Sequence, residues 1–385
     1  MFIPMNRVCP NSLRILAVVG IALILAGCTS KETKEALQKA TALQDQKKYQ
    51  DANGILLEAL RARETKIRSE NNSPSDSASA AALTKKVQTD SEILKMERVQ
   101  IMLYLAMERA DLASAVYSDI QTGSPGDSVI YGALKSKEPV IRTGAVRVLG
   151  LAGKPEAIDT LANATKDESQ DVRRAAVAAL GTIKDPKVVD PLISALKDSY
   201  WFVRSDAADA LGREKDARAI KPLLDAVNDS DSNVESSAEN ALILLTMVKG
   251  VPTDDFVAHL NDSNPKLVTV SAVCLALLKD ARATPVLLKL AASTDAQTRL
   301  HAVKALGETG DASVIPTLRQ TLKDPEINVR GWSIIGLGKL NDQASIPDLI
   351  AIAANGNESP NIRAAATAAV KHLTAASAPP QPAAR

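Results

Sequence analysis

The chain has 385 residues, of which 45% are apolar and only 3% are aromatic. Large single cores usually draw on aromatic bulk, so this composition favours stacked short helices that pack through small residues. The 46 basic and 45 acidic residues give a net charge of +1 and are scattered along the chain. A nucleic-acid-binding protein concentrates Lys and Arg on one face, so we expect no nucleic-acid partner.

Residues 1–27 have the organisation of a secretory leader. Arg7 and Arg14 come before an unbroken apolar run over residues 15–25, and two small residues follow the run. The run is about half of the ~20 residues that a transmembrane helix needs, so we expect the leader to be removed.

The sequence Leu-Ala-Gly-Cys at 25–28 resembles the lipobox of bacterial lipoproteins. The resemblance implies cleavage between Gly27 and Cys28 and acylation of Cys28, and two or more acyl chains give a stable membrane anchor. Thr29 follows instead of the Asp that retains some lipoproteins in the inner membrane, which favours the outer membrane, facing the periplasm. The alternative is an ordinary secretory peptide in which Cys28 is incidental.

Cysteine usage leaves no pair for a disulfide. Cys9 lies in the leader and Cys28 is the predicted acylation site, so only Cys274 remains as a thiol.

Residues 28–125 predict a small helical module. Apolar positions on two consecutive segments resemble a tetratricopeptide hairpin: Ala36, Ala40, Leu43, Tyr49, Ala52, Leu56, Ala59 and Leu60. A polar stretch near 69–80 predicts a disordered insert, and a second helical pair is expected over 90–120. The module is either a partner-binding groove or a cap for the repeats that follow, and the sequence leaves both open.

From residue 126 to 375 the chain repeats itself eight times. Each repeat has an anchor position, usually Arg, and successive anchors are 31 or 33 residues apart. The anchors are Arg142, Arg173, Arg204, Glu235, Val268, Arg299, Arg330 and Arg363. The positions −1, +3 and +7 from each anchor are apolar, Ala or Ser, and Leu respectively, with few exceptions. They share one helix face, so each repeat contains a helix with a buried stripe.

Turn signals divide each repeat into two helices. A glycine eight residues after the anchor is expected to end the anchor helix, as at Gly150, Gly181, Gly212, Gly307 and Gly338. An Asp twelve residues after the anchor is expected to cap the next helix, as at Asp185, Asp216, Asp280, Asp311 and Asp342. A Pro in or near the first turn follows each of these Asp residues. The fold class predicted is therefore all-α, an α-solenoid of about eight helix pairs after a small helical module, with a disordered tail over 376–385.

This pattern resembles the HEAT family, particularly the HEAT-like repeats of phycobilin lyases. The family implies an Asp six residues before each Arg, the two forming a ladder between repeats. Three pairs fit completely: Asp167 and Arg173, Asp198 and Arg204, and Asp324 and Arg330. Exposed ion pairs are worth only ~0.2–1 kcal/mol each, whereas truncating a buried Leu costs roughly 2–5 kcal/mol, so the Leu column is expected to dominate stability.

The ladder is expected to be interrupted in the fourth and fifth repeats, where Asp229 precedes Glu235 and Asp262 precedes Val268. This gap marks either a hinge or ordinary drift between repeats.

Motifs for catalysis are not found in the sequence. Its three His residues lie outside zincin and di-iron His-Glu motifs, and the glycines near 150–154 lack the spacing of a phosphate loop. We expect no metal, no cofactor and no catalytic residue. The alternative function is an enzyme or accessory subunit related to the HEAT-like bilin lyases, but fold likeness alone does not carry function.

The expected function is a lipid-anchored scaffold that binds unidentified protein partners. HEAT arrays usually bind along their second helices, where positions +2 and +5 from the anchor face outward. The candidate binding residues are Arg147, Asp206, Asp209, Asn240, His301, Lys304, Trp332 and Ile335.

Overall fold

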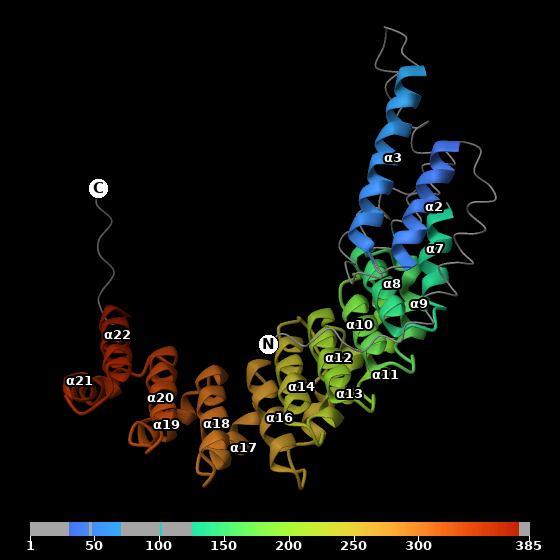
Figure 1. Ribbon diagram of the computed structural model, residues 1–385. Coiled ribbons are helices and arrows are strands. Elements are labelled where there is room, and N and C mark those ends of the chain that lie inside the picture. The colour runs from blue at the N-terminus through green and yellow to red at the C-terminus, as the bar shows by residue number, and fades with distance from the viewer. Residues whose placement is uncertain (1–30, 46–47, 71–100, 102–124, 377–385) are drawn as a thin grey trace, which may run out of the picture. The chain divides into compact units, whose positions relative to one another are not determined.

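The structure is a computed structural model that describes residues 31–45, 48–70, 101 and 125–376 (Figure 1). Every regular element in these residues is a helix. The chain divides into two compact units, residues 1–195 and 196–385, and each is described by itself. The leader, Cys28, most of the predicted insert and the tail beyond 376 lie outside the described residues.

The first unit begins with two helices that pack against each other, α2 (Lys31–Asp45) and α3 (Tyr49–Glu70). Leu37, Ala40, Ala52 and Leu56 are buried between them. Helix α3 continues two residues beyond Arg68, where the polar insert was expected to begin. Of the helical pair expected over 90–120, only Ile101 is described; it is helical and buried.

The rest of the first unit consists of repeat helices. They are α7 (Pro125–Ala133), α8 (Pro139–Ala152), α9 (Ile158–Ala164), α10 (Gln170–Leu180) and α11 (Val189–Ala195). The anchor helices α8 and α10 pack side by side, and the shorter α9 packs against both. Single 3₁₀ turns, η1 (Pro155–Ala157) and η2 (Pro186–Val188), precede α9 and α11.

The second unit continues the same alternation of helices. Its anchor helices are α12 (Trp201–Glu214), α14 (Ser232–Leu245), α16 (Pro265–Leu277), α18 (Ala296–Thr309), α20 (Ile327–Lys339) and α22 (Pro360–Ala376). The shorter partners are α13 (Ile220–Ala226), α15 (Asp254–Ala258), α17 (Ala283–Leu290), α19 (Ile315–Thr321) and α21 (Ile346–Ala354). The 3₁₀ turns η3 (Ala217–Ala219), η4 (Ala312–Val314) and η5 (Gln343–Ser345) precede α13, α19 and α21.

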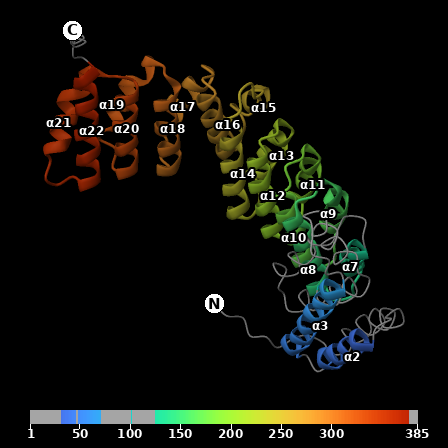
Figure 2. The same cartoon turned by 90° about the horizontal axis from the view of Figure 1, so that it is seen from above.

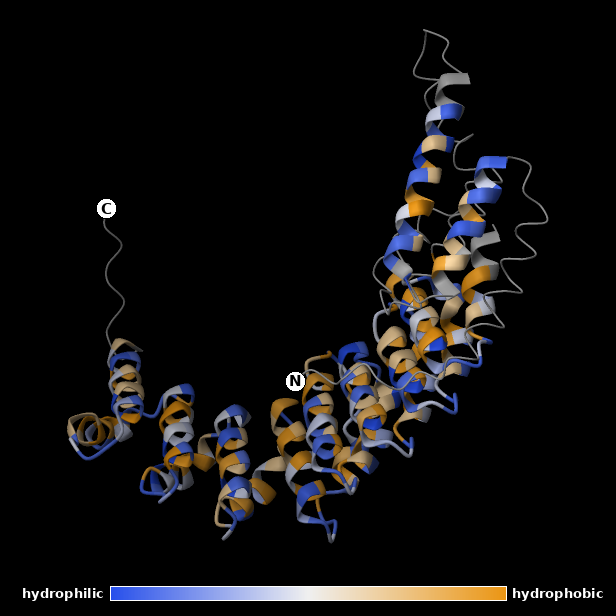
Figure 3. Ribbon diagram, viewed as in Figure 1, coloured by the Kyte–Doolittle hydropathy of each residue, from blue (hydrophilic) through white to orange (hydrophobic). Residues whose placement is uncertain are grey.

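Two layers of helices result within this unit. Each anchor helix contacts the anchor helix of the next repeat, and each shorter helix packs against the anchor helix that follows it (Figure 2). Leu211, Leu242, Leu275, Leu306 and Leu337 are fully buried along the anchor helices. Most helices carry both apolar and polar residues (Figure 3), as expected of helices with one face in the core and one in solvent.

The expectation that the repeated glycines end the anchor helices is wrong. Gly150, Gly212, Gly307 and Gly338 lie inside their helices, and Gly181, directly after α10, has a right-handed φ of −66°. A Cβ at Gly150 would lie 2.6 Å from the Cβ of Ala179 on the neighbouring anchor helix, and one at Gly307 would lie 2.8 Å from the Cα of Gly336. Gly150, Gly212 and Gly307 are required because neighbouring anchor helices approach one another closely at these positions, whereas a Cβ at Gly338 would make only an ordinary contact at 3.9 Å.

Other residues adopt the left-handed conformation at or near the helix ends. They are Gly153, Lys215, Lys279, Gly310 and Asn341, with φ between 56° and 74°. Each lies eleven residues after its anchor, so the sequence pattern placed this turn three residues too early. Only Gly153 and Gly310 among them are glycines.

The predicted Asp caps hold at four positions of five. The carboxylates of Asp185, Asp216, Asp280 and Asp311 each accept a hydrogen bond from the backbone N–H two residues later, at 2.8–3.0 Å. Asp342 is the exception, because its carboxylate receives the side chain of Arg319 instead, with Nε 2.7 Å from Oδ2. A search of the described helices finds none with the length and apolar character needed to cross a membrane.

Candidate functional site

The anchor arginines form an ion-pair ladder whose rungs connect successive repeats. The guanidinium of Arg142 donates to both carboxylate oxygens of Asp167, at 2.8 and 2.7 Å, and Arg204 does the same to Asp229, at 2.6 Å each. In both cases the partner lies 25 residues later, in the following repeat. The carboxylate six residues before an Arg therefore belongs to the preceding rung.

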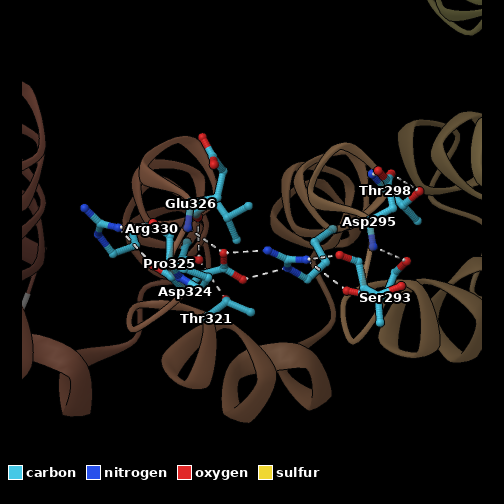
Figure 4. A network of polar contacts seen from close by, with 12 residues as sticks. Ser293, Asp295, Thr298, Thr321, Asp324, Pro325, Glu326 and Arg330 are labelled. Carbon is cyan, nitrogen blue, oxygen red and sulfur yellow. Dashed lines mark hydrogen bonds and ion pairs between the residues drawn. The ribbon is translucent and has the colours of Figure 1, made fainter.

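The backbone, and not the carboxylate, connects the Arg and Asp that are six residues apart. Nη1 of Arg173, Arg204 and Arg330 donates to the backbone carbonyl oxygens of Asp167, Asp198 and Asp324, at 3.1, 2.8 and 2.9 Å. Figure 4 shows Asp324 and Arg330 in one such network. Each of these three Arg residues thus fixes the turn before its own helix, and Arg204 also holds the turn of the next repeat through Asp229.

Two further rungs complete the ladder near its C-terminal end. Arg299 pairs with both oxygens of Asp324, at 2.8 and 3.0 Å. Arg330 pairs with Glu358, at 3.0 and 2.6 Å, and the longer Glu side chain comes from 28 residues later because Asn355 occupies the usual place.

These rungs are largely shielded from solvent. The exposed side-chain fractions are 13% and 12% for Arg204 and Asp229, and 13% and 7% for Arg299 and Asp324. The hydrogen bonds from the arginines hold the pKa values of Asp229, Asp324 and Glu358 below their ordinary range. The expectation that these ion pairs are exposed is therefore wrong, and it underestimates their contribution to stability.

The ladder changes at the two anchor positions that are not Arg, Glu235 and Val268. Asp229 keeps an arginine partner, because it pairs with Arg204 of the preceding repeat. Glu235 instead forms an ion pair with Lys266 of the next repeat, at 2.6 Å. In this rung the carboxylate comes from the earlier repeat and the cation from the later one, the reverse of the other rungs. At Val268 no rung is possible, since the position 25 residues later is Ser293. The backbone oxygen of Ser293 accepts from Arg299 at 3.0 Å, and its hydroxyl oxygen accepts from the backbone N–H of Asp295 at 3.2 Å. Figure 4 shows Ser293 and Asp295 in this network.

The candidate binding residues all lie on anchor helices. Arg147 lies on α8 of the first unit and is exposed. In the second unit Asp209, Asn240, His301 and Lys304 are exposed, Ile335 is 38% exposed, and Asp206 and Trp332 are half-buried.

Lys304 and Trp332 form a contact between adjacent repeats. Nζ of Lys304 on α18 lies 4.8 Å from the centroid of the Trp332 ring on α20, which is a cation–π arrangement. Partial desolvation and the nearby Lys304 lower the pKa of His301, which lies one turn earlier on α18 and stays partly exposed. Trp332 is therefore half-buried and is contacted by a cation from the preceding repeat.

A groove that the sequence did not indicate lies between α20 and α22. Its volume is about 290 Å³, and it is lined by Ile334, Ile335, Gly338, Lys339, Ala365, Ala368, Ala369 and His372. Most of these side chains are small or apolar. Of the candidate binding residues only Ile335 lines it, and the signal that sequence reasoning missed is the Ala-rich face of α22 opposite Gly338.

The described residues contain no group of three or more His, Cys, Asp and Glu placed to hold a metal ion. The thiol of Cys274 is fully buried, and burial raises its pKa. Because the thiolate is the reactive form, Cys274 is a poor nucleophile.

Stacked helix pairs with an inter-repeat ladder define an α-solenoid. Family comparison agrees, because the model for HEAT repeats matches residues 161–243, 253–326 and 315–380. The chain belongs to the HEAT-repeat family. None of the curated proteins compared with the sequence matches it.

Two solved structures show the same fold at low sequence identity. The Kap95:Nup1 complex matches with a TM-score of 0.54 and 14% identity, covering 94% of this chain and 62% of that chain. Kap95p bound to RanGDP matches with a TM-score of 0.54 and 13% identity, covering 93% of this chain and 60% of that one. The CpcE and CpcF complex of phycocyanin lyase from Nostoc sp. PCC7120 has 19% identity and a TM-score of 0.32, covering 64% and 94%.

Proposed function

We propose that this protein is a lipid-anchored, extracytoplasmic scaffold that binds other proteins at a bacterial membrane through its HEAT repeats. The observation that carries the binding role is the partly accessible Trp332, held by Lys304 and followed one turn later by the exposed Ile335. Trp is enriched among residues that dominate binding energy, and a fixed ring loses little entropy when a partner binds. The HEAT fold itself is mainly a scaffold, and Kap95 is a HEAT-fold protein solved with protein partners.

The anchor rests on the lipobox resemblance at 25–28. Helix α2 begins at Lys31, three residues after Cys28, so an acylated chain would carry its first folded element close to the membrane. The absence of Asp after Cys28 favours the outer membrane, with the repeats facing the periplasm.

A scaffold is favoured over the alternative of a modifying enzyme or its accessory subunit. The buried Cys274 does not offer a thiolate, and the clearest feature of the anchor helices is a contact surface with an aromatic centre. Metal analysis of the purified protein separates the two classes, because a stoichiometric bound metal would contradict the scaffold proposal.

Site-specific crosslinking in intact cells tests the binding role. A photoreactive residue at Ile335 or at Lys304 is expected to capture the same partner, whereas one at Lys289 is not. Lys289 is an exposed residue on α17, in the layer of shorter helices, and is the matched control. Capture through Lys289 alone, or through none of the three, would contradict binding by the anchor-helix surface.

A further inference from the structure

The groove between α20 and α22 is an open, mostly apolar depression on the surface of the second unit. Its volume of about 290 Å³ exceeds that of a single large apolar residue, and its walls include Ile334, Ile335 and Ala368. Gly338 has no side chain to fill the bottom of the groove. A Cβ at this position would lie 3.9 Å from the Cβ of Ala369, which is an ordinary contact distance. Trp332 precedes Ile335 by one turn of α20, so the apolar surface continues beyond the groove.

The anchor helices around this surface carry mostly positive charges, while carboxylates such as Asp295, Asp324, Glu326 and Glu358 lie in the turns before them. The last three anchor helices, α18, α20 and α22, contain six Lys and Arg residues and one acidic residue, Glu308. The basic residues are Arg299, Lys304, Arg330, Lys339, Arg363 and Lys371.

Some of these basic residues are already neutralised. Arg299 and Arg330 belong to the ladder, and Lys339 at the groove pairs with Glu308. Lys304 lies over Trp332, and Lys371 is exposed on α22, next to the groove residue His372. The surface therefore keeps cations without carboxylate partners beside its apolar centre.

The anchor helices nearer the start of the same unit have the opposite character. Helices α12 and α14 contain five acidic residues, Asp206, Asp209, Glu214, Glu235 and Glu239, and two basic ones, Arg204 and Arg213. An acidic segment is therefore expected to favour α18 to α22 over α12 and α14, because like charges placed opposite each other cost affinity.

We propose that the α20–α22 groove, together with Trp332, binds an acidic amphipathic segment of a partner protein that inserts one bulky apolar side chain between Ile335 and Ala368. The inserted residue takes the place of a core side chain between the two helices. Carboxylates of the same segment face Lys304 and Lys371. This mode is that of a helix or extended segment laid into an apolar groove with a charged rim. The inference rests on the proposed scaffold function and specifies the partner's chemistry.

A peptide selection on the purified full chain tests the proposal. A displayed library of random 16-residue peptides is selected on the wild-type protein, and the dissociation constants of the enriched peptides are measured. We expect an excess of Asp and Glu together with Leu, Ile, Phe or Met. Enrichment of neutral or basic peptides, or no enrichment, would overturn the proposal.

Matched variants at one exposed position separate charge from shape. Ala368→Glu is expected to weaken binding at least about tenfold, whereas Ala368→Lys, of similar length, is expected to preserve it or strengthen it. Equal losses of affinity in both variants would contradict the proposal that the partner is acidic. Ile350→Asp is the control, because Ile350 is 52% exposed on α21 and does not line the groove. Thermal unfolding establishes that each variant is folded.

Two further outcomes keep this inference distinct from the scaffold proposal. If crosslinking through Ile335 captures a partner in cells but binding is indifferent to Ala368→Glu, the scaffold stands and the groove assignment fails. If Cys28→Ala protein binds phosphatidylglycerol vesicles and Ala368→Glu abolishes that binding, the basic surface meets lipid, which also overturns the peptide assignment.

Discussion

The guanidinium of Arg204 and the carboxylate of Asp229, 25 residues later, are joined by two hydrogen bonds of 2.6 Å, and only about an eighth of either side chain is exposed. The same Arg donates to the backbone oxygen of Asp198 in its own turn, at 2.8 Å. One side chain therefore links two inter-helix turns, so the ladder fixes the register between repeats as well as adding stability.

A double-mutant cycle on this rung measures its strength. Arg204→Ala is expected to lower the free energy of unfolding by about 2 kcal/mol or more, between the values for exposed and fully buried pairs, because Asp229 is left without its partner. Asp229→Ala is expected to cost a similar amount, and the double variant less than the sum. Urea unfolding followed by circular dichroism gives the three values. Strictly additive losses would mean that the rung contributes no coupling.

Acid is expected to weaken the ladder before it affects the apolar core. The pKa values of Asp229 and Asp324 are lowered in the folded state, chiefly by hydrogen bonds from Arg204 and Arg299. A carboxyl group whose folded pKa is depressed contributes stability above its unfolded pKa, 3.8 for Asp, and loses it as pH falls through the folded value. The free energy of unfolding should therefore fall below about pH 4. Asp229→Asn should show a smaller fall, and parallel curves for the two proteins would contradict this origin.

The sequence located the ladder residues but not their pairing. Asp167 and Arg173 are close in the chain, so a local pair is the natural interpretation, yet the carboxylate of Asp167 is held by Arg142 of the previous repeat. Periodicity reveals which positions recur, whereas contacts between repeats depend on how the helices stack. The groove between α20 and α22 was missed for the same reason, since it arises from two helices whose first residues, Ile327 and Pro360, are 33 residues apart in the chain.

The missing rung at Val268 can be restored. Val268 and Ser293 are 25 residues apart, at the positions that carry Arg and Asp in the complete rungs. Val268→Arg together with Ser293→Asp is expected to be more stable than the sum of the single variants by roughly 0.5–3 kcal/mol. Either single variant adds one unpaired charge and is expected to be neutral or destabilising. Additivity of the two changes would show that α16 and α18 do not bring these positions together as other repeats do.

Lipidation at Cys28 has a direct consequence for fractionation. Cys28→Ala is expected to move the protein from the membrane to the soluble fraction, because no acyl chain is then attached. Wild-type protein labelled with a radioactive fatty acid and then fractionated is the positive control. Continued membrane retention of the alanine variant would show that another feature holds the chain at the membrane.

The close approach of anchor helices predicts opposite effects from one chemical change at two glycines. Gly307→Ala places a Cβ 2.8 Å from the Cα of Gly336, so the helices must separate, and we expect a loss of about 1–3 kcal/mol. Gly54→Ala lies inside α3 with no atom within 4 Å of the new Cβ, so higher helix propensity should raise stability by about 0.5–1 kcal/mol. Thermal and urea unfolding of both variants test the pair. The helical backbone at Gly307 accepts alanine without strain, so packing against Gly336 is the only source of the expected loss. If Gly307→Ala also stabilised the protein, helix packing would not explain the recurring glycines.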